Sequence, residues 1–329
     1  MTSQTIDAAA AGTWTLGDLV VNRIGFGAMR LPQHGEAFAP GAVPRDRDEA
    51  VRVLRRAVEL GVNHIDTAAF YFSALRSANE LIGRALAPFR TDLVIATKVG
   101  PARDRSGAWE PHATPGQLRG QVEQNLRELG RDQLDLVNLR VVGTDPVAER
   151  FGALADLRQA GLIRHLGLSN VHPHHLDEAL AIAPVVCVQN MYGVGVRPEQ
   201  AGFVRRCGSL GVAFVPFYSI AGTARAAGMA RAADTTRADG AARAAGSARA
   251  DATAGTAGLG GAGGDDAVRA VAATHGASPA QIRIAWTLHQ GPHVLAIPGT
   301  GDPEHLAANV AAGALRLTAQ DLARLDAAG

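Results

Sequence analysis

The segments DLVIATK (Asp92–Lys98), TPGQLRGQVEQNLREL (114–129) and LDLVNL (134–139) decide the fold. The first and third are short apolar runs of strand length. The middle segment has the marks of a helix, with Thr114 as N-cap, a proline in the first turn and Gly130 after the last. Strand, helix and strand in this order predict two parallel strands joined by a right-handed crossover.

The same alternation continues along the whole chain. Strands are expected at 23–27, 63–66, 92–97, 134–139, 163–168, 185–188, 212–217 and 294–297. Helices are expected at 47–60, 78–86, 114–129, 146–160, 173–181, 198–210, 265–275, 278–288 and 303–311, with a last helix capped by Thr318. Eight strand-helix units over about 300 residues match a closed (β/α)8 TIM barrel better than an open doubly wound sheet. The segment WTLGDLVV (Trp14–Val21) predicts a β-hairpin that plugs the barrel floor.

A single barrel domain is expected over residues 13–329, after a flexible tail over residues 1–12. A segment over 221–264 interrupts it after the seventh strand; 28 of its 44 residues are Ala or Gly, and Arg recurs at every sixth position from 225 to 249. Six positions turn an α-helix by about 600°, so successive arginines do not share a face. We interpret the segment as a mostly mobile low-complexity insertion. The alternative is a row of arginines over an anionic ligand.

We expect the barrel to stay folded when residues 221–264 are shortened to a short linker. The segment offers almost no apolar bulk beyond Met229 and Leu259, and long surface insertions cost little closure entropy. Thermal unfolding of the shortened chain checks this, with an unchanged melting temperature as the expected result. A large fall in melting temperature would show that the segment is packed.

Composition argues against several classes of protein. The net charge of +1 gives no support to broad electrostatic binding of nucleic acid. No apolar run approaches the roughly 18 residues of a membrane helix, and the first residues lack the basic and apolar regions of a secretory signal. Cys187 and Cys207 stand in unrelated contexts, so neither a disulfide framework nor a metal site is expected. We expect a reduced, cytoplasmic protein; its oligomeric state is left open.

The use of lysine is the most informative count. Of the 32 basic residues only one, Lys98, is a lysine. Arginine keeps a fixed, delocalised charge, whereas the lysine ammonium is compact and its pKa responds to its surroundings. Lys98 follows an apolar run and so stands at the carboxyl end of the third strand, where the active sites of such barrels lie. The alternative is the chance survival of one surface lysine.

Asp66 and Tyr71 belong to the same edge of the predicted barrel. Asp66 ends the second strand, and Tyr71, one of three tyrosines, follows on the next loop. A buried rim that holds Asp66 and Lys98 predicts an ion pair, and a nearby ammonium favours a phenolate. A phenol in that setting can act as a general acid or base. Taken alone, Asp66 is as readily a turn or capping residue and Tyr71 a loop aromatic; together with the single lysine they predict a catalytic triplet.

From about Trp14 to Asp326, apart from the insertion, the chain resembles the aldo-keto reductase family. The motifs that carry the resemblance are NHIDTAAFY (63–71), Thr97-Lys98, GLSN (167–170), and IPGT (297–300) continuing to His305-Leu306 and Asn309. The resemblance implies reduction of an aldehyde or ketone with NADPH, and no separate dinucleotide-binding domain. The chain also lacks a convincing G-x-G-x-x-G after a strand.

The resemblance also implies a role for each residue of the site. Tyr71 would donate the proton, with Lys98 held beside it by Asp66. Catalytic roles are implied for Asp66, Tyr71, Lys98 and Arg140, and substrate contacts for Met29, Tyr71, Trp109 and Arg140. The cofactor carboxamide would be bound by Ser169, Asn170 and Gln189, the nicotinamide would stack on Phe217, and the 2′-phosphate would lie among Gly299, Thr300, His305 and Asn309. The other implied cofactor contacts are Gly27, Ala28, Met29, Asp66, Tyr218, Ile220 and Pro298. The alternative interpretation is that Ser169 and Asn170 form a helix cap and that His305 is a surface histidine without a ligand.

Two positions depart from the family pattern. Arg140 stands where the family usually has His, and the run Asn138-Leu139-Arg140 is similar to a bacterial subgroup of pyridoxal reductases. Gly299 stands where many relatives carry a lysine for the 2′-phosphate, so NADH is less expected than NADPH but stays open. The expected function is an NADPH-dependent carbonyl reductase, with pyridoxal to pyridoxine as the first substrate. The alternatives are a reductase of a secondary-metabolite carbonyl and a non-catalytic NADPH-sensing subunit.

Overall fold

The computed structural model describes residues 6–35, 37–38, 42–221 and 263–328, and seven parallel strands form its central sheet. The strands are β3 (Phe26–Gly27), β4 (His64–Asp66), β5 (Val94–Val99), β6 (Leu134–Arg140), β7 (Ile163–Ser169), β8 (Val185–Gln189) and β9 (Ala213–Phe214). Each strand pairs with the next one along the chain. This order, with the connections on the outside, is the right-handed winding of a (β/α)8 barrel.

Residues 293–296 close the barrel in the place of the expected eighth strand. They are not a continuous strand, but Ala296 forms a parallel bridge with Ile24 and Val294 forms one with Phe214. The amide of Gly25 donates to the carbonyl of Ala296 at 2.8 Å, and Leu295 donates to Phe214 at 2.9 Å. The predicted (β/α)8 fold is confirmed, with its eighth strand reduced to these bridges.

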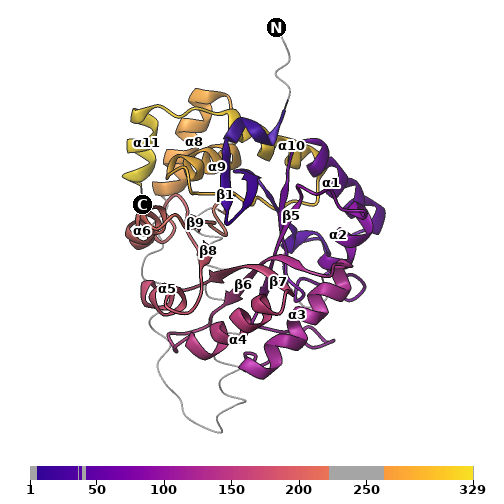
Figure 1. Ribbon diagram of the computed structural model, residues 1–329. Coiled ribbons are helices and arrows are strands. Elements are labelled where there is room, and N and C mark those ends of the chain that lie inside the picture. Colours follow the sequence, from indigo (N-terminus) through magenta and orange to yellow (C-terminus); the bar gives the residue numbers. More distant parts are fainter. Residues whose placement is uncertain (1–5, 36, 39–41, 222–262, 329) are drawn as a thin grey trace.

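Helices surround the strands (Figure 1). They are α1 (Arg47–Glu59), α2 (Ala78–Leu86), α3 (Pro115–Leu129), α4 (Ala148–Gln159), α5 (Pro173–Leu180), α6 (Ala201–Ser209), α8 (Gly263–His275), α9 (Pro279–His289), α10 (Pro303–Ala311) and α11 (Ala319–Asp326). The predicted caps Thr114, Ser278 and Thr318 stand at the N-caps of α3, α9 and α11, and Gly130 ends α3 in the left-handed conformation. No helix among the described residues is long and apolar enough to cross a membrane.

The N-terminal hairpin fills the bottom of the barrel, as predicted. Strand β1 (Thr13–Leu16) pairs antiparallel with β2 (Leu19–Asn22) around a turn at Gly17, whose φ is 68°. Leu16 and Val21 are buried in one cluster with inward-facing strand residues such as Leu136. The apolar side chains that fill the lower barrel leave the polar side chains to the upper, carboxyl end of the strands.

Two segments were expected to be mobile, the tail over 1–12 and the insertion over 221–264. Those of their residues that the structure describes are packed against the barrel. Residues Ala8–Ala11 form a short 3-10 helix, and Ala8 is fully buried with its amide bonded to the carbonyl of Leu60 at 2.8 Å. This described part of the expected tail over 1–12 is packed against the barrel. Ala221 is buried and α8 begins at Gly263, so both ends of the expected insertion belong to the barrel. Residues 1–5 and 222–262 lie outside the described residues.

Candidate active site

The barrel brings Asp66 and Lys98 into direct contact at the carboxyl end of adjacent strands. The Lys98 Nζ atom lies 2.5 Å from Asp66 Oδ1 and 3.1 Å from the carbonyl oxygen of Thr67. The two residues are only 3% and 4% exposed. Burial alone lowers the pKa of Lys98, but the charge of Asp66 and the nearby Tyr71 outweigh it and raise the pKa above the ordinary value. The ammonium therefore keeps its proton at neutral pH.

Tyr71 completes the predicted triplet. Its ring centroid lies 5.0 Å from Lys98 Nζ, and the residue is 7% exposed. The loop that carries it is fixed on both sides, because the Tyr71 amide donates to Ala68 O at 2.9 Å and the Ala78 amide donates to Tyr71 O at 2.8 Å. A phenol, an ammonium and a carboxylate thus meet at one buried point, from two strands and one loop.

A second phenol lies close to the same point. Tyr218 has a φ of 61°, a strained value for a residue with a side chain. Burial raises the pKa of Tyr218; Arg140 opposes this shift, Tyr71 adds to it, and Lys98 opposes it. Tyr218 is thus within electrostatic reach of all three groups. Its ring is edge-on to that of Phe217, with centroids 5.3 Å apart.

Arg140 lies at the end of β6, on the side of Ser169 and Phe217. Its Nη1 donates to Ser169 Oγ at 3.3 Å, and its guanidinium lies 5.3 Å from the centre of the Phe217 ring. No acidic partner of Arg140 is present among the described residues. The position fits the expected rim of the site, although its direct contacts are with residues expected at the nicotinamide.

Aromatic rings form a wall beside Tyr71. The Phe38 ring lies 5.8 Å from that of Tyr71 and 5.3 Å from that of Trp109, an expected substrate contact. Phe70 packs against the same two rings, at 5.1 and 5.6 Å. The Arg103 guanidinium lies over Phe38 and Trp109, at 5.1 and 5.8 Å. Sequence reasoning missed Phe38 and Arg103, since neither lies in a periodic segment or a motif.

The expected carboxamide residues stand in a row across β7 and β8. Ser169 is paired with Gln189 in the strand register. The Gln189 Nε2 atom donates to Asp66 Oδ2 at 2.7 Å, while its Oε1 atom is buried without a partner. The side chain of Asn170, at a φ of 59°, donates to Val141 O at 2.8 Å. The unpartnered Gln189 oxygen is an acceptor that a carboxamide amino group fits.

Gly27 and Gly299 pack backbone against backbone, where the first strand meets the last. A Cβ atom at Gly299 would lie 2.4 Å from Gly27 O, and one at Gly27 would lie 2.6 Å from Ile297 O. Neither position has room for a side chain. A lysine at 299, which the family resemblance led us to compare with this position, would not fit this backbone.

The start of α10 differs from the simple anion site that its motif suggests. The Asp302 carboxylate accepts from the amides of Glu304 and His305, at 2.7 and 3.3 Å, so these donors are already used. The His305 side chain is 75% exposed, and Asn309 is buried one turn later. Arg45, which sequence reasoning missed, donates to Gly301 O at 3.1 Å, and its buried Nε atom has no partner. The Arg45 guanidinium is also paired with Glu49, at 2.6 Å.

The remaining expected contacts surround the same mouth of the barrel. Ala28 is buried and Met29 half-buried in the short 3-10 turn that follows β3, while Ile220 is half-buried after β9. Pro298 is buried and Thr300 half-buried on the loop that leads to α10. One polar residue of the barrel interior was also missed: Asn138, paired with Lys98 in the register, is buried with both amide atoms unpartnered.

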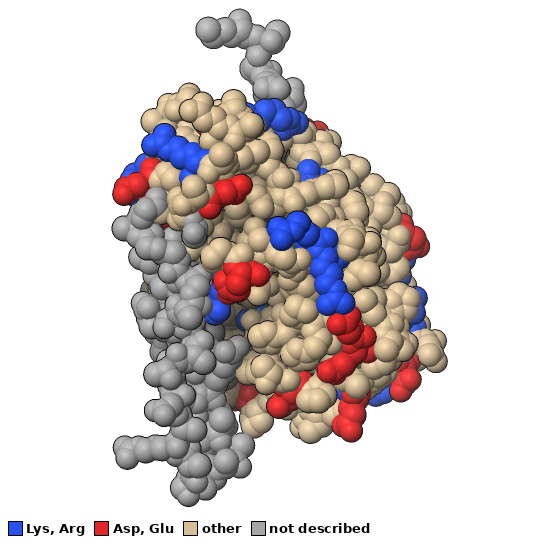
Figure 2. Space-filling model, turned by 90° about the vertical axis from the view of Figure 1, so that its left-hand side faces the viewer, with Lys and Arg blue, Asp and Glu red and all other residues tan. Residues whose placement is uncertain are grey.

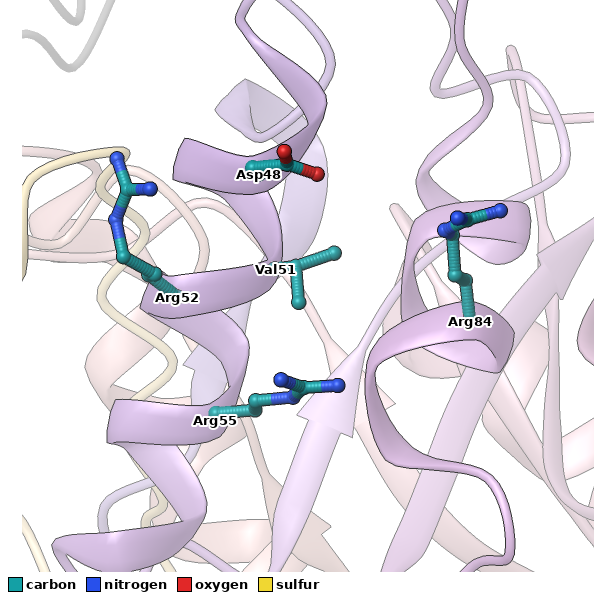
Figure 3. Close-up of a pocket in the computed structure, with 5 residues that line it drawn as sticks. All are labelled: Asp48, Val51, Arg52, Arg55 and Arg84. Atoms are coloured by element: carbon teal, nitrogen blue, oxygen red, sulfur yellow. The ribbon is translucent and has the colours of Figure 1, made fainter.

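Surface features elsewhere do not compete with this site. A hollow of about 370 Å³ lies between α1 and α2, lined by Asp48, Val51, Arg52, Arg55 and Arg84. Figure 3 shows the Arg52 side chain pointing away from α2. None of the expected site residues lines this hollow. On the face in Figure 2, basic and acidic side chains are interspersed over the described surface, and the described residues contain no cluster of three or more metal-binding side chains.

Comparisons with known proteins agree with this geometry. A model of the aldo/keto reductase family matches residues 23–329. Pyridoxine 4-dehydrogenase of Escherichia coli is 38% identical over 96% of this chain and 98% of its own length. An uncharacterised oxidoreductase of Schizosaccharomyces pombe is 34% identical over 99% of this chain and 93% of its own.

Solved structures show the same relationship. A thermostable aldo-keto reductase in complex with the inhibitor epalrestat matches with a TM-score of 0.71 and 27% identity, over 96% of this chain and 99% of its own. An aldo-keto reductase of Klebsiella pneumoniae in complex with NADPH matches with a TM-score of 0.69 and 25% identity, over 96% and 94%. The chain belongs to the aldo-keto reductase family. It is an NADP-dependent oxidoreductase that acts on small carbonyl compounds.

Proposed function

We propose that this protein reduces an aldehyde to an alcohol with Tyr71 as the proton donor, and that pyridoxal is a substrate. The observation that carries the proposal is the buried contact of Asp66, Lys98 and Tyr71 at the carboxyl edge of the barrel. NADPH, when bound, supplies the hydride. The residues of the chain supply the proton, the binding contacts and the exclusion of water.

The triplet accounts for the proton. Lys98 stays charged because Asp66 holds it at 2.5 Å, and an ammonium beside the Tyr71 ring stabilises the phenolate that remains once the proton has left. Asp66 is in turn fixed by Gln189 through its second oxygen. The phenol can therefore donate to the carbonyl oxygen, while the aromatic wall of Phe38 and Trp109 limits access of water to that point.

The residues at the barrel mouth fit the nicotinamide cofactor. Gln189 Oε1 offers an unpartnered buried acceptor; Ser169 is its neighbour at the end of β7, and Asn170 follows directly after that strand. Phe217 presents a ring on which the nicotinamide would stack. The 2′-phosphate would lie near Thr300 and the start of α10, where Arg45, paired with Glu49, is the basic side chain that could turn toward it in place of a lysine at 299.

Pyridoxal is favoured by two features. The E. coli relative is a pyridoxine 4-dehydrogenase, and Arg140 places a fixed positive charge at the rim of the site. Such a charge favours a substrate with a phenolate oxygen, which the ring of pyridoxal carries. A secondary-metabolite carbonyl is the alternative substrate, and a non-catalytic NADPH sensor is the alternative function.

The test is the oxidation of NADPH in the presence of pyridoxal and of a panel of aliphatic, aromatic and sugar aldehydes. We expect turnover, with pyridoxal among the best substrates by kcat/KM. Turnover of other carbonyls alone would replace pyridoxal as the substrate. Tight binding of NADPH with no turnover of any carbonyl would favour the sensor instead.

We expect Arg140 to set substrate preference and not to donate the proton, since a guanidinium does not deprotonate near neutral pH. Arg140→His should keep kcat/KM for benzaldehyde within about threefold and lower it for pyridoxal by about 10-fold or more, the usual range for a lost hydrogen bond to a charged group. Steady-state kinetics with both aldehydes measure this. An equal change for the two substrates would show that Arg140 does not recognise the phenolate.

A further inference from the structure

Four fully buried polar side chains form one hydrogen-bonded network behind the wall of the barrel, between the strands and helices α2 and α3. Thr67 Oγ1 donates to Asn79 Oδ1 at 2.8 Å, and Asn79 Nδ2 donates to Asn125 Oδ1 at 2.9 Å. Thr97 Oγ1 donates to the same Asn125 oxygen at 2.6 Å. All four residues are 0% exposed. None of the four side chains belongs to the site described above.

The two ends of this network are the chain neighbours of the ion pair. Thr67 follows Asp66, and its carbonyl oxygen accepts from Lys98 Nζ. Thr97 precedes Lys98, and because side chains alternate across a strand, the Thr97 hydroxyl lies on the opposite face of β5. The network therefore joins the two strand ends from the side of the helices, while the ion pair joins them from the inside.

The helices hold the two asparagines in place. Asn125 Nδ2 donates to Gln121 O at 2.8 Å in its own helix, and Asn79 Nδ2 also donates to Glu128 Oε2 at 3.1 Å. Helices α2 and α3 approach closely at Gly83, where a Cβ atom would lie 3.2 Å from Leu129 O. A buried network whose members are all hydrogen-bonded is rigid, and an unpaired member is costly.

We propose that Asn79 and Asn125 are positioning residues, which fix the distance between Asp66 and Lys98 through Thr67 and Thr97. The inference rests on the proposed role of the triplet in carbonyl reduction. A Lys98 ammonium that moves by about 1 Å relative to the phenol loses much of its effect, because catalysis of this kind is steeply sensitive to geometry.

The test compares Thr97→Val, which removes the hydroxyl with little change of shape, with Thr97→Ser, which keeps it. Asn125 Oδ1 retains its bond from Asn79 in both variants, so the fold is expected to survive. Thr287→Val is the matched control: Thr287 is equally buried, and its hydroxyl donates to Arg283 O at 2.8 Å within α9, outside the active site. Thr67→Val tests the other end of the network, and replaces Thr97→Val if that variant does not fold.

We expect Thr97→Val to lower kcat about 10-fold or more with the KM of the carbonyl within about twofold, in line with the cost of a small misplacement. Thr97→Ser should recover most of the loss, and Thr287→Val should lower stability with kcat near that of the wild type. A Thr97→Val enzyme with wild-type kcat overturns the proposal.

A second readout does not depend on activity. Because Lys98 is the only lysine, a chain labelled with [ε-13C]lysine gives one side-chain signal by NMR. Wild-type Lys98 should stay protonated to a higher pH than free lysine. In Thr97→Val it should lose its proton at a lower pH than in the wild type, because a displaced Asp66 opposes the effect of burial less. An unchanged Lys98 titration overturns the positioning role, whatever kcat does. If the wild type reduces no carbonyl, the proposed function fails, and this titration still decides the network.

Discussion

Tyr71→Phe is expected to abolish carbonyl reduction and to leave NADPH binding intact. The change removes one oxygen from a 7% exposed ring and leaves the packing against Phe38 and Phe70 in place. Because the hydroxyl acts only when the proton is transferred, kcat should fall by about 100-fold or more with little effect on cofactor affinity. Steady-state kinetics and a fluorescence titration with NADPH measure the two quantities.

The matched control for this experiment is Tyr192→Phe. Tyr192 is also buried, and its hydroxyl donates to Gln290 Oε1 at 3.0 Å, away from the site. This variant reports the cost of losing one buried phenol oxygen, and its kcat should stay near that of the wild type. A Tyr71→Phe enzyme with near-normal kcat would mean that another group donates the proton, and Tyr218 would be tested next.

Lys98→Arg should be nearly as damaging as Lys98→Met, with a loss in kcat of about 100-fold. The side chain is 3% exposed and packed between Asp66 Oδ1 and the Thr67 carbonyl. A guanidinium is larger and planar, so it either displaces Asp66 or moves its charge away from the phenol. The measurement is kcat for each variant together with its melting temperature, which separates a lost charge position from a lost fold.

Arg283→Lys is the reciprocal control. Arg283 is 4% exposed and forms an ion pair with Asp265 at the junction of α8 and α9. Exchange of the basic residue there should lower stability and leave kcat unchanged, because Arg283 bonds to Asp265 and to the carbonyl of Val194, and neither belongs to the expected site. A fully active Lys98→Arg enzyme would show that the single lysine is a coincidence of composition.

The alternation of strands and helices could be predicted because residues within or next to each element mark where it begins and ends. Thr114 and Gly130 mark α3 from cap to cap, and the apolar runs locate most strands within one or two residues. The eighth strand was predicted as a full strand over 294–297, but it is held only by bridges and by bonds such as Gly25 to Ala296. Such a reduction depends on neighbours far along the chain, and no local pattern records it.

The candidate site also contains residues that local sequence identifies and residues that only contacts between distant segments identify. The meeting of Asp66, Tyr71 and Lys98 could be predicted because each is conspicuous in its own segment, and the barrel brings the strand ends together. Phe38 and Arg45 lie in a loop whose path is set by contacts with Tyr71 and with Gly301. For Gln189 the sequence predicts a cofactor contact but not the bond from its amide nitrogen to Asp66, which leaves only its oxygen without a partner. Roles of this kind depend on contacts with residues far along the chain, and a single sequence does not show those contacts.

The burial of Lys98 also gives the folded chain an unusual response to reagents. A protease that cleaves after lysine has one target bond in the whole sequence, and that lysine is 3% exposed in a barrel strand. Cleavage then requires β5 to open. The rate at which the intact chain is converted into two fragments on a gel therefore reports the opening of the barrel core. The same burial predicts that amine-reactive dyes modify Lys98 slowly as long as the barrel stays folded.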